Sequence, residues 1–154
     1  MTDQLQPGDH APAFDLASDG ENNLSSSDLK GKTVVLYFYP KDDTPGCTLE
    51  AQDFNARQAD FAAVGTTVIG LSKDSVKSHD KFCKKHGLSI VLASDEGGQT
   101  CENYGVWVEK SMYGKKYMGT ARKTFIIDEN QNIIAIIDKV DTKNASQQVL
   151  DTLK

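Results

Sequence analysis

Residues 33–51 read TVVLYFYPKDDTPGCTLEA and place a strand signal directly before a helix signal. The first part, Thr33–Tyr39, is an unbroken β-branched and aromatic run, as expected for a strand that is covered on both faces. Pro45 favours the first position of a helix, because its missing N–H needs no partner there. Cys47 therefore lies in the first helical turn, at the boundary between the two elements. A cysteine that only fills space in the core is expected in the middle of a strand or helix. The position of Cys47 at a boundary therefore suggests a chemical role.

The remaining sequence alternates strand and helix patterns. An extended segment over 1–13 leads into a short strand, Phe14–Leu16, and a turn at Asp19-Gly20. Further strands are expected at Thr66–Ser72, Leu88–Leu92, Thr124–Asp128 and Ile133–Ile137, the last two joined as a hairpin. Helices are expected at Pro45–Ala63, 75–86, 96–104 and 143–153, with a helical turn at Ser25–Asp28 and a polar loop at 109–119. This order predicts an α/β fold, a three-layer sandwich with a central mixed β-sheet and flanking helices.

Length and composition limit the class of protein. The 154 residues suit one domain, and no repeat or linker divides the range 1–154. A net charge of −5 argues against nucleic acid or an anionic membrane surface as the main partner. No apolar run of about 18 residues and no signal peptide is visible. Three cysteines without a CxxC pair indicate working thiols in a reducing compartment, which predicts a cytoplasmic protein.

The first turn of the helix suits a thiolate nucleophile at Cys47. Thr44 is the expected N-cap, and its hydroxyl can accept from a backbone N–H near Cys47. Free N–H groups and the helix dipole stabilise negative charge there, and helix N-termini can lower a thiol pKa from about 8.5 to ~3.5–7.5. Gly46 lets a substrate approach the backbone, and Pro40 can shield the site from water. The alternative is a small, buried and inert cysteine that happens to begin a helix.

The pattern Pro40-x-x-x-Thr44-x-x-Cys47 resembles the active-site motif of the peroxiredoxins, thiol peroxidases with a thioredoxin-like fold. The wider text FYPKDDTPGCTLEAQDF resembles the bacterioferritin comigratory protein branch, also called peroxiredoxin Q. The similarity covers nearly the whole chain. It includes Gly8–Phe14, Leu29–Lys32, Tyr104-Gly-Val and Arg122–Asp128. The resemblance implies a peroxidase that reduces hydrogen peroxide and organic hydroperoxides without a cofactor or a metal, in a branch that is often monomeric.

The resemblance also implies roles for individual residues. Cys47 would be the peroxidatic cysteine and would become a sulfenic acid. Thr44 would hydrogen-bond the peroxide and the thiolate. Arg122 would hold the thiolate ionised and stabilise charge on the leaving oxygen. Glu50 matches the branch and either orients the site or simply favours the start of the helix.

The chain departs from the branch at the resolving thiol. Many members of the branch carry a second cysteine five positions after the first. That position is Gln52 here, which leaves Cys83 and Cys101 as candidates. Some members use a cysteine in the helix at 75–86, and we expect Cys83 to be the resolving residue. A disulfide needs α-carbons within about 7 Å, so turns of one or both helices would have to unwind after the sulfenic acid forms.

Several alternatives remain open. Cys83-x-x-His86 has the spacing of a pair of metal ligands, but no second pair accompanies it. The resemblance implies thioredoxin or a glutaredoxin-type dithiol as reductant. The other interpretations are a one-cysteine peroxidase that an external thiol resolves, and a redox sensor or holdase without turnover.

Overall fold

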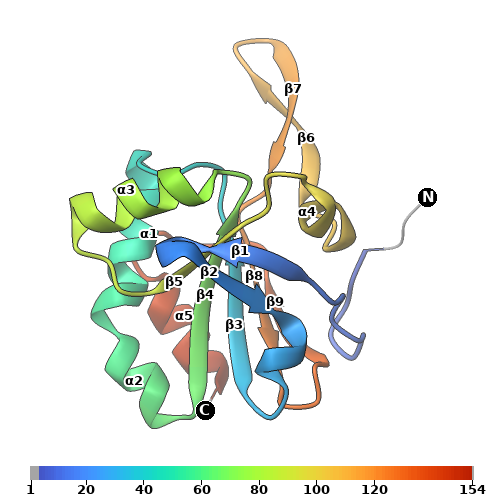
Figure 1. Cartoon of the computed structure of the whole chain (residues 1–154). Helices are drawn as coiled ribbons and strands as arrows, with labels where there is room; N and C mark the ends of the chain where they lie inside the picture. Colours follow the sequence, from blue (N-terminus) through green and yellow to red (C-terminus); the bar gives the residue numbers. More distant parts are fainter. Residues whose placement is uncertain (1–3, 154) are drawn as a thin grey trace.

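Strand β3 (Thr33–Phe38) lies in the interior of a seven-stranded mixed sheet (Figure 1). The structure is a computed structural model that describes residues 4–153. The strand order is β2-β1-β5-β4-β3-β8-β9. Strand β3 pairs parallel with β4 and antiparallel with β8, and β4 pairs parallel with β5. The other strands of this sheet are β1 (Asp15–Ser18), β2 (Asn22–Ser25), β4 (Thr66–Ser72), β5 (Val91–Ser94), β8 (Lys123–Ile127) and β9 (Ile133–Ile137).

Side chains of β3 alternate between two hydrophobic layers, which confirms a strand that is buried on both faces. Val35 and Tyr37 pack with residues of α1 (Pro45–Ala56), α2 (Gln58–Ala63), α3 (Val76–His86) and α5 (Ala145–Leu153). Leu36 and Phe38 pack on the opposite face, with α4 (Gln99–Asn103) and the N-terminal segment. The expected three-layer α/β sandwich is therefore confirmed.

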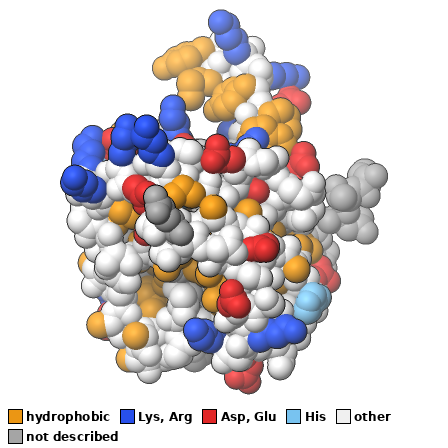
Figure 2. Space-filling model, in the orientation of Figure 1, with side chains coloured by type: hydrophobic (Ala, Val, Ile, Leu, Met, Phe, Trp, Pro, Cys, Tyr) orange, Lys and Arg blue, Asp and Glu red, His pale blue; other side chains and the backbone are white. Residues whose placement is uncertain are grey.

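A second, two-stranded sheet projects beyond the main one. Strands β6 (Trp107–Met112) and β7 (Lys115–Thr120) form a hairpin over the range predicted as a polar loop, so that prediction was wrong. Tyr113 and Gly114 both have positive φ, 53° and 79°, as a two-residue type I′ hairpin turn requires. Hydrophobic and lysine side chains gather on this projecting hairpin in Figure 2.

Other elements also differ from the sequence predictions in their bounds. The helix expected over Pro45–Ala63 is interrupted at Arg57, which has φ −110° and ψ 14° and separates α1 from α2. Asp19 and Gly20 belong to a short 3₁₀ helix, Asp19–Glu21, that joins β1 to β2, and the second strand of this pair was missed. Strand β5 begins at Val91, three residues after the expected Leu88. The helical turn at Ser26–Leu29 agrees with the expectation to within one residue.

Candidate active site

Cys47 lies in the first turn of α1, as the sequence predicted. Thr44 is the N-cap residue in an extended conformation, and Pro45 occupies the first helical position. The Cys47 side chain is only 2% exposed and packs in the same hydrophobic layer as Ala51. Pro40 is half-buried in the connection between β3 and α1. The fold thus presents one shielded sulfur at a helix N-terminus.

The predicted capping bond of Thr44 is not formed. Its hydroxyl Oγ1 instead donates to the carbonyl oxygen of Lys41 at 2.8 Å, within the same loop. The competing acceptor lies only three residues away, and local side-chain to backbone bonds of this kind are common for threonine. Thr44 therefore closes the loop that precedes the helix rather than capping the helix itself.

Arg122 joins Cys47 to Glu50. It lies between β7 and β8, and its Nη2 donates to Cys47 Sγ at 3.3 Å. Its Nη1 donates to Glu50 Oε1 at 2.7 Å. Glu50 lies one helical turn after Cys47 and is fully buried. Its ion pair with Arg122 fixes the position of the guanidinium beside the sulfur. The planar guanidinium has two donors at the spacing this bridge needs, which an ammonium group lacks.

Burial and neighbouring charges shift the pKa values of Glu50 and Arg122 in opposite directions. Burial raises the pKa of Glu50 to about 7, although the nearby charge of Arg122 lowers it. Burial also opposes the charge of Arg122, but Cys47 and Glu50 outweigh that effect and raise the pKa of the guanidinium. Arg122 therefore stays cationic against the sulfur. Of the two interpretations of Glu50, the geometry favours an orienting residue.

Two neighbours of Arg122 complete the site. A side chain on Gly46 would place its Cβ 3.2 Å from Arg122 Nη2, so glycine makes room for the guanidinium. Lys110 on β6 was missed by the sequence analysis. Burial, and then the charge of Arg122, lower its pKa, whereas the charge of Cys47 raises it. No local motif marks Lys110, because only the hairpin brings it to the site.

The other two cysteines lie on opposite faces of the sheet. Cys83 is half-buried on α3 and contacts the hydrophobic layer that contains Cys47. Cys101 is fully buried in α4, in the layer on the other face. All three cysteines are free thiols in this structure. Burial, followed by the charges of Asp19, Asp42 and Asp80, raises the pKa of Cys83 to about 12.

Among residues 4–153, no group of three or more histidine, cysteine or acidic side chains is arranged to hold a metal ion. Within the same range, no helix is long and apolar enough to cross a membrane.

Comparison with known proteins places the chain in a family. A model of the AhpC/TSA family matches residues 7–136. The chain belongs to the AhpC/TSA family. A putative peroxiredoxin Bcp of Coxiella burnetii is 47% identical over 97% of this chain and 99% of its own length. Peroxiredoxin Bcp of Bacillus subtilis is 43% identical over 97% and 96%.

Solved structures agree with these relatives. A mutant of Xylella fastidiosa PrxQ has a TM-score of 0.92 at 35% identity and covers 99% of this chain and 97% of that one. A Xanthomonas campestris bacterioferritin comigratory protein, studied for its alkyl peroxide reduction activity, has a TM-score of 0.86 at 38% identity, with coverage of 91% and 89%. The expected peroxiredoxin of the Bcp and PrxQ type, with its thioredoxin-like fold and peroxidase class, is confirmed.

Proposed function

We propose that this peroxidase reduces hydroperoxides at Cys47, with Arg122 and Thr44 binding the substrate. The observation that supports this most directly is the bridge from Arg122 to both Cys47 and the buried Glu50. A fixed cation beside the sulfur stabilises a thiolate and the negative charge that develops on the departing oxygen. Gly46 leaves room for the guanidinium at the helix N-terminus. We propose that Pro40, half-buried in the preceding loop, shields the thiol from water.

The first step oxidises the sulfur by two electrons. Cys47 Sγ attacks one oxygen of the hydroperoxide, and an S–O bond forms as the O–O bond breaks. The other oxygen takes a proton and leaves as alcohol or water, while Cys47 becomes a sulfenic acid. The apolar surroundings of Cys47 are compatible with alkyl as well as hydrogen peroxide, which agrees with the activity named for the Xanthomonas campestris protein.

Cys83 would then resolve the sulfenic acid. Its sulfur attacks the Cys47 sulfur, an S–S bond forms, and the S–O bond breaks with release of water. Cys83 shares a hydrophobic layer with Cys47, whereas the sheet lies between Cys47 and Cys101. The high pKa of Cys83 keeps it protonated and unreactive while α3 is folded. Opening of α3 would therefore let the Cys83 sulfur approach Cys47 and would also make the Cys83 thiol more reactive.

Recycling requires a dithiol that donates two electrons to the disulfide. Thioredoxin is the proposed donor, and a glutaredoxin-type protein is the alternative. We place the reaction in the cytoplasm, where such donors keep thiols reduced, and we propose that the chain works as a monomer.

The test is peroxide consumption coupled to thioredoxin, thioredoxin reductase and NADPH. Cys47→Ser is expected to abolish turnover. Cys83→Ser is expected to lose thioredoxin-supported turnover but to keep the first oxidation, and Cys101→Ser is expected to retain both. Loss in Cys101→Ser with retention in Cys83→Ser would reverse the resolving assignment. A wild-type sulfenic acid that never converts to a Cys47–Cys83 disulfide would favour a one-cysteine peroxidase. Oxidation without any consumption of NADPH would favour a redox sensor.

A further inference from the structure

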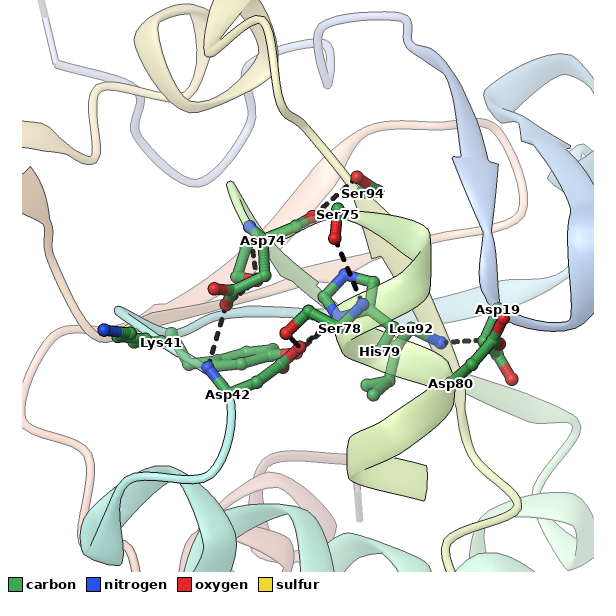
Figure 3. Close-up of polar contacts among 12 residues, drawn as sticks. Asp19, Lys41, Asp42, Asp74, Ser75, Ser78, His79, Asp80, Leu92 and Ser94 are labelled. Carbon is green, nitrogen blue, oxygen red and sulfur yellow. Dashed lines mark hydrogen bonds and ion pairs between the residues drawn. The ribbon is translucent and has the colours of Figure 1, made fainter. Parts of the chain in front are cut away.

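A buried polar network connects α3 to the loop before the candidate nucleophile (Figure 3). Asp42 lies in that loop, between Pro40 and Thr44, and its side chain is almost fully buried. Its Oδ2 accepts from Ser78 Oγ at 2.8 Å and lies 2.7 Å from Nδ1 of His79. Both of those residues belong to the first turns of α3.

The charge state of this pair follows from its partners. Nε2 of His79 lies 2.9 Å from the backbone carbonyl oxygen of Ala93 on β5. A carbonyl oxygen and a carboxylate only accept, so both ring nitrogens must carry a proton to satisfy both contacts. Tyr39 donates its hydroxyl to the other Asp42 oxygen, Oδ1, at 2.5 Å. His79 is thus held as an imidazolium against a fully hydrogen-bonded carboxylate.

Asp42 is also held in place through its backbone, in the loop before α1. The backbone N–H of Asp42 donates to Asp74 Oδ2 at 2.8 Å, and that oxygen also accepts from Ser72 Oγ at 2.7 Å. A second link at the surface joins Asp43 to Lys85 and His86, at 2.7 and 2.8 Å. Exposed pairs of this kind contribute little, so the buried pair carries the connection.

The network lies where resolution has to occur. His79 precedes Cys83 by four residues and therefore lies one turn earlier on the same face of α3. Cys83 cannot leave its half-buried position by unwinding of the preceding turn without breaking the contact between His79 and Asp42. Withdrawal of His79 would leave the buried Asp42 carboxylate without its counter-charge, so this contact opposes opening.

We propose that Asp42 and His79 are positioning residues for the resolving step. Their buried ion pair holds α3, the helix of Cys83, against the active-site loop and limits the rate at which α3 opens. The proposal rests on the proposed function, in which Cys83 resolves Cys47. It predicts a long-lived sulfenic acid in the wild type, which excess peroxide can oxidise further to the irreversible sulfinic acid.

The pair also makes opening depend on pH. Burial disfavours the charged ring, but the hydrogen bond to Asp42 and its charge outweigh burial and raise the pKa of His79 above its ordinary value of 6.5. A raised histidine pKa means that the stabilisation is complete below about pH 6.5 and is lost as the pH rises through the folded-state pKa. The charged and titratable groups that face His79 are Asp42, Tyr39 and Asp74. We therefore expect α3 to open more readily in mildly alkaline solution.

The first test measures opening itself. Hydrogen exchange of the α3 amides is compared for the reduced wild type, Asp42→Asn, Ser78→Ala and Asp95→Asn. Asp42→Asn keeps the shape but removes the charge, and Ser78→Ala removes one hydrogen bond and is the milder variant. Asp95 is the matched control, because it is equally buried but accepts from backbone N–H groups of α4. We expect α3 protection to fall about tenfold or more in Asp42→Asn, to fall less in Ser78→Ala, and to stay unchanged in Asp95→Asn.

The second test measures resolution. After one equivalent of hydrogen peroxide, rapid quenching and mass spectrometry follow the Cys47 sulfenic acid and the Cys47–Cys83 disulfide. The disulfide should form faster in Asp42→Asn by about the factor by which α3 protection falls, and less sulfinic acid should accumulate in excess peroxide. The pH dependence of α3 protection is measured in Cys83→Ser, because ionisation of that thiol would itself favour opening. Protection should fall above neutral pH in this chain and lose that dependence when Asp42→Asn is added.

The outcomes separate the two proposals. Absence of a Cys47–Cys83 bond in the wild type would overturn the resolving assignment, and with it the role given to this pair. A bond that forms in the wild type at the same rate as in both Asp42→Asn and Ser78→Ala would overturn the pair's role alone. Equal loss of α3 protection in Asp95→Asn would also overturn it, because the effect would then be one of general stability.

Discussion

Replacement of Glu50 by glutamine should change how the stability of the chain depends on pH. Glu50 is fully buried, and among residues 4–153 its Oε2 has no hydrogen-bond partner, while Oε1 accepts from Arg122. Burial raises its pKa from 4.5 to about 7. The folded chain therefore binds this proton more tightly than the unfolded chain does, and stability falls as the pH rises through that interval.

The size of the effect follows from the same values. One unit of pKa difference corresponds to about 1.4 kcal/mol, so the rise from 4.5 to about 7 corresponds to roughly 3 kcal/mol. Roughly 2.5 kcal/mol of this falls between pH 5 and pH 8, because part of the titration lies below pH 5. Glutamine keeps the shape and an acceptor for Arg122 but does not titrate, so the variant should lose this component.

Urea unfolding of the reduced chain at pH 5 and at pH 8 provides the measurement. Between the two conditions the wild type should lose roughly 2.5 kcal/mol more stability than Glu50→Gln, with other titrating groups cancelling in the comparison. Glu102→Gln, at an exposed position on α4, is the matched control and should follow the wild type. If wild type and Glu50→Gln lose the same stability within about 0.5 kcal/mol, Glu50 does not titrate as argued and the reasoning fails.

Three further predictions concern the same region and its support. Arg122→Lys keeps the charge but not the two-donor bridge, and should slow single-turnover oxidation of Cys47 about tenfold or more; a rate within threefold of wild type would contradict this. Gly46→Ala would crowd Arg122 Nη2 at 3.2 Å and should slow the same reaction several-fold, while urea unfolding shows stability within about 1 kcal/mol of wild type. Gly70→Ala would place a Cβ 2.7 Å from the Tyr37 ring and should cost about 1–3 kcal/mol in urea unfolding, without a direct effect on the thiol; an unchanged midpoint would show that the ring can move aside.

The sequence predicts the core of this molecule well, because local signals and tertiary packing agree there. Thr33–Tyr39 carries its own burial pattern, and the Thr-Pro-Gly-Cys text places the sulfur at a helix start without any tertiary information. Local sequence signals predict the wrong hydrogen bond where a side chain has two possible partners. Thr44 satisfies its hydroxyl on Lys41, an acceptor that the one-dimensional pattern does not distinguish from the helix N–H groups.

The projecting hairpin was missed for a different reason. A type I′ turn usually contains Asn-Gly, and Tyr113-Gly114 forms one without that signature, so the lysine-rich segment was interpreted as a loop. That error also hid Lys110, which reaches the site only through the pairing of β6 with β7.

The break in the first helix and the network around Asp42 depend on contacts distant in sequence. No proline or glycine marks Arg57, whose guanidinium instead contacts Asp60 and Gln147. Asp42 and His79 are separated by 37 positions. Helical spacing with Val76 and Cys83 places His79 on the inward face of its helix, but no local signal identifies Asp42 as its partner. Their partnership becomes visible only when β3, α3 and β5 are placed together.

The projecting hairpin has a practical consequence for handling the molecule. Strands β6 and β7 share no ladder with the seven-stranded sheet, and Tyr113 at the tip is 97% exposed. A dye or an affinity tag attached at the tip would lie away from the sandwich. The strand that carries it, β7, ends two residues before Arg122. The tip of the projecting hairpin is thus a suitable place for a spectroscopic probe of structural changes near Cys47.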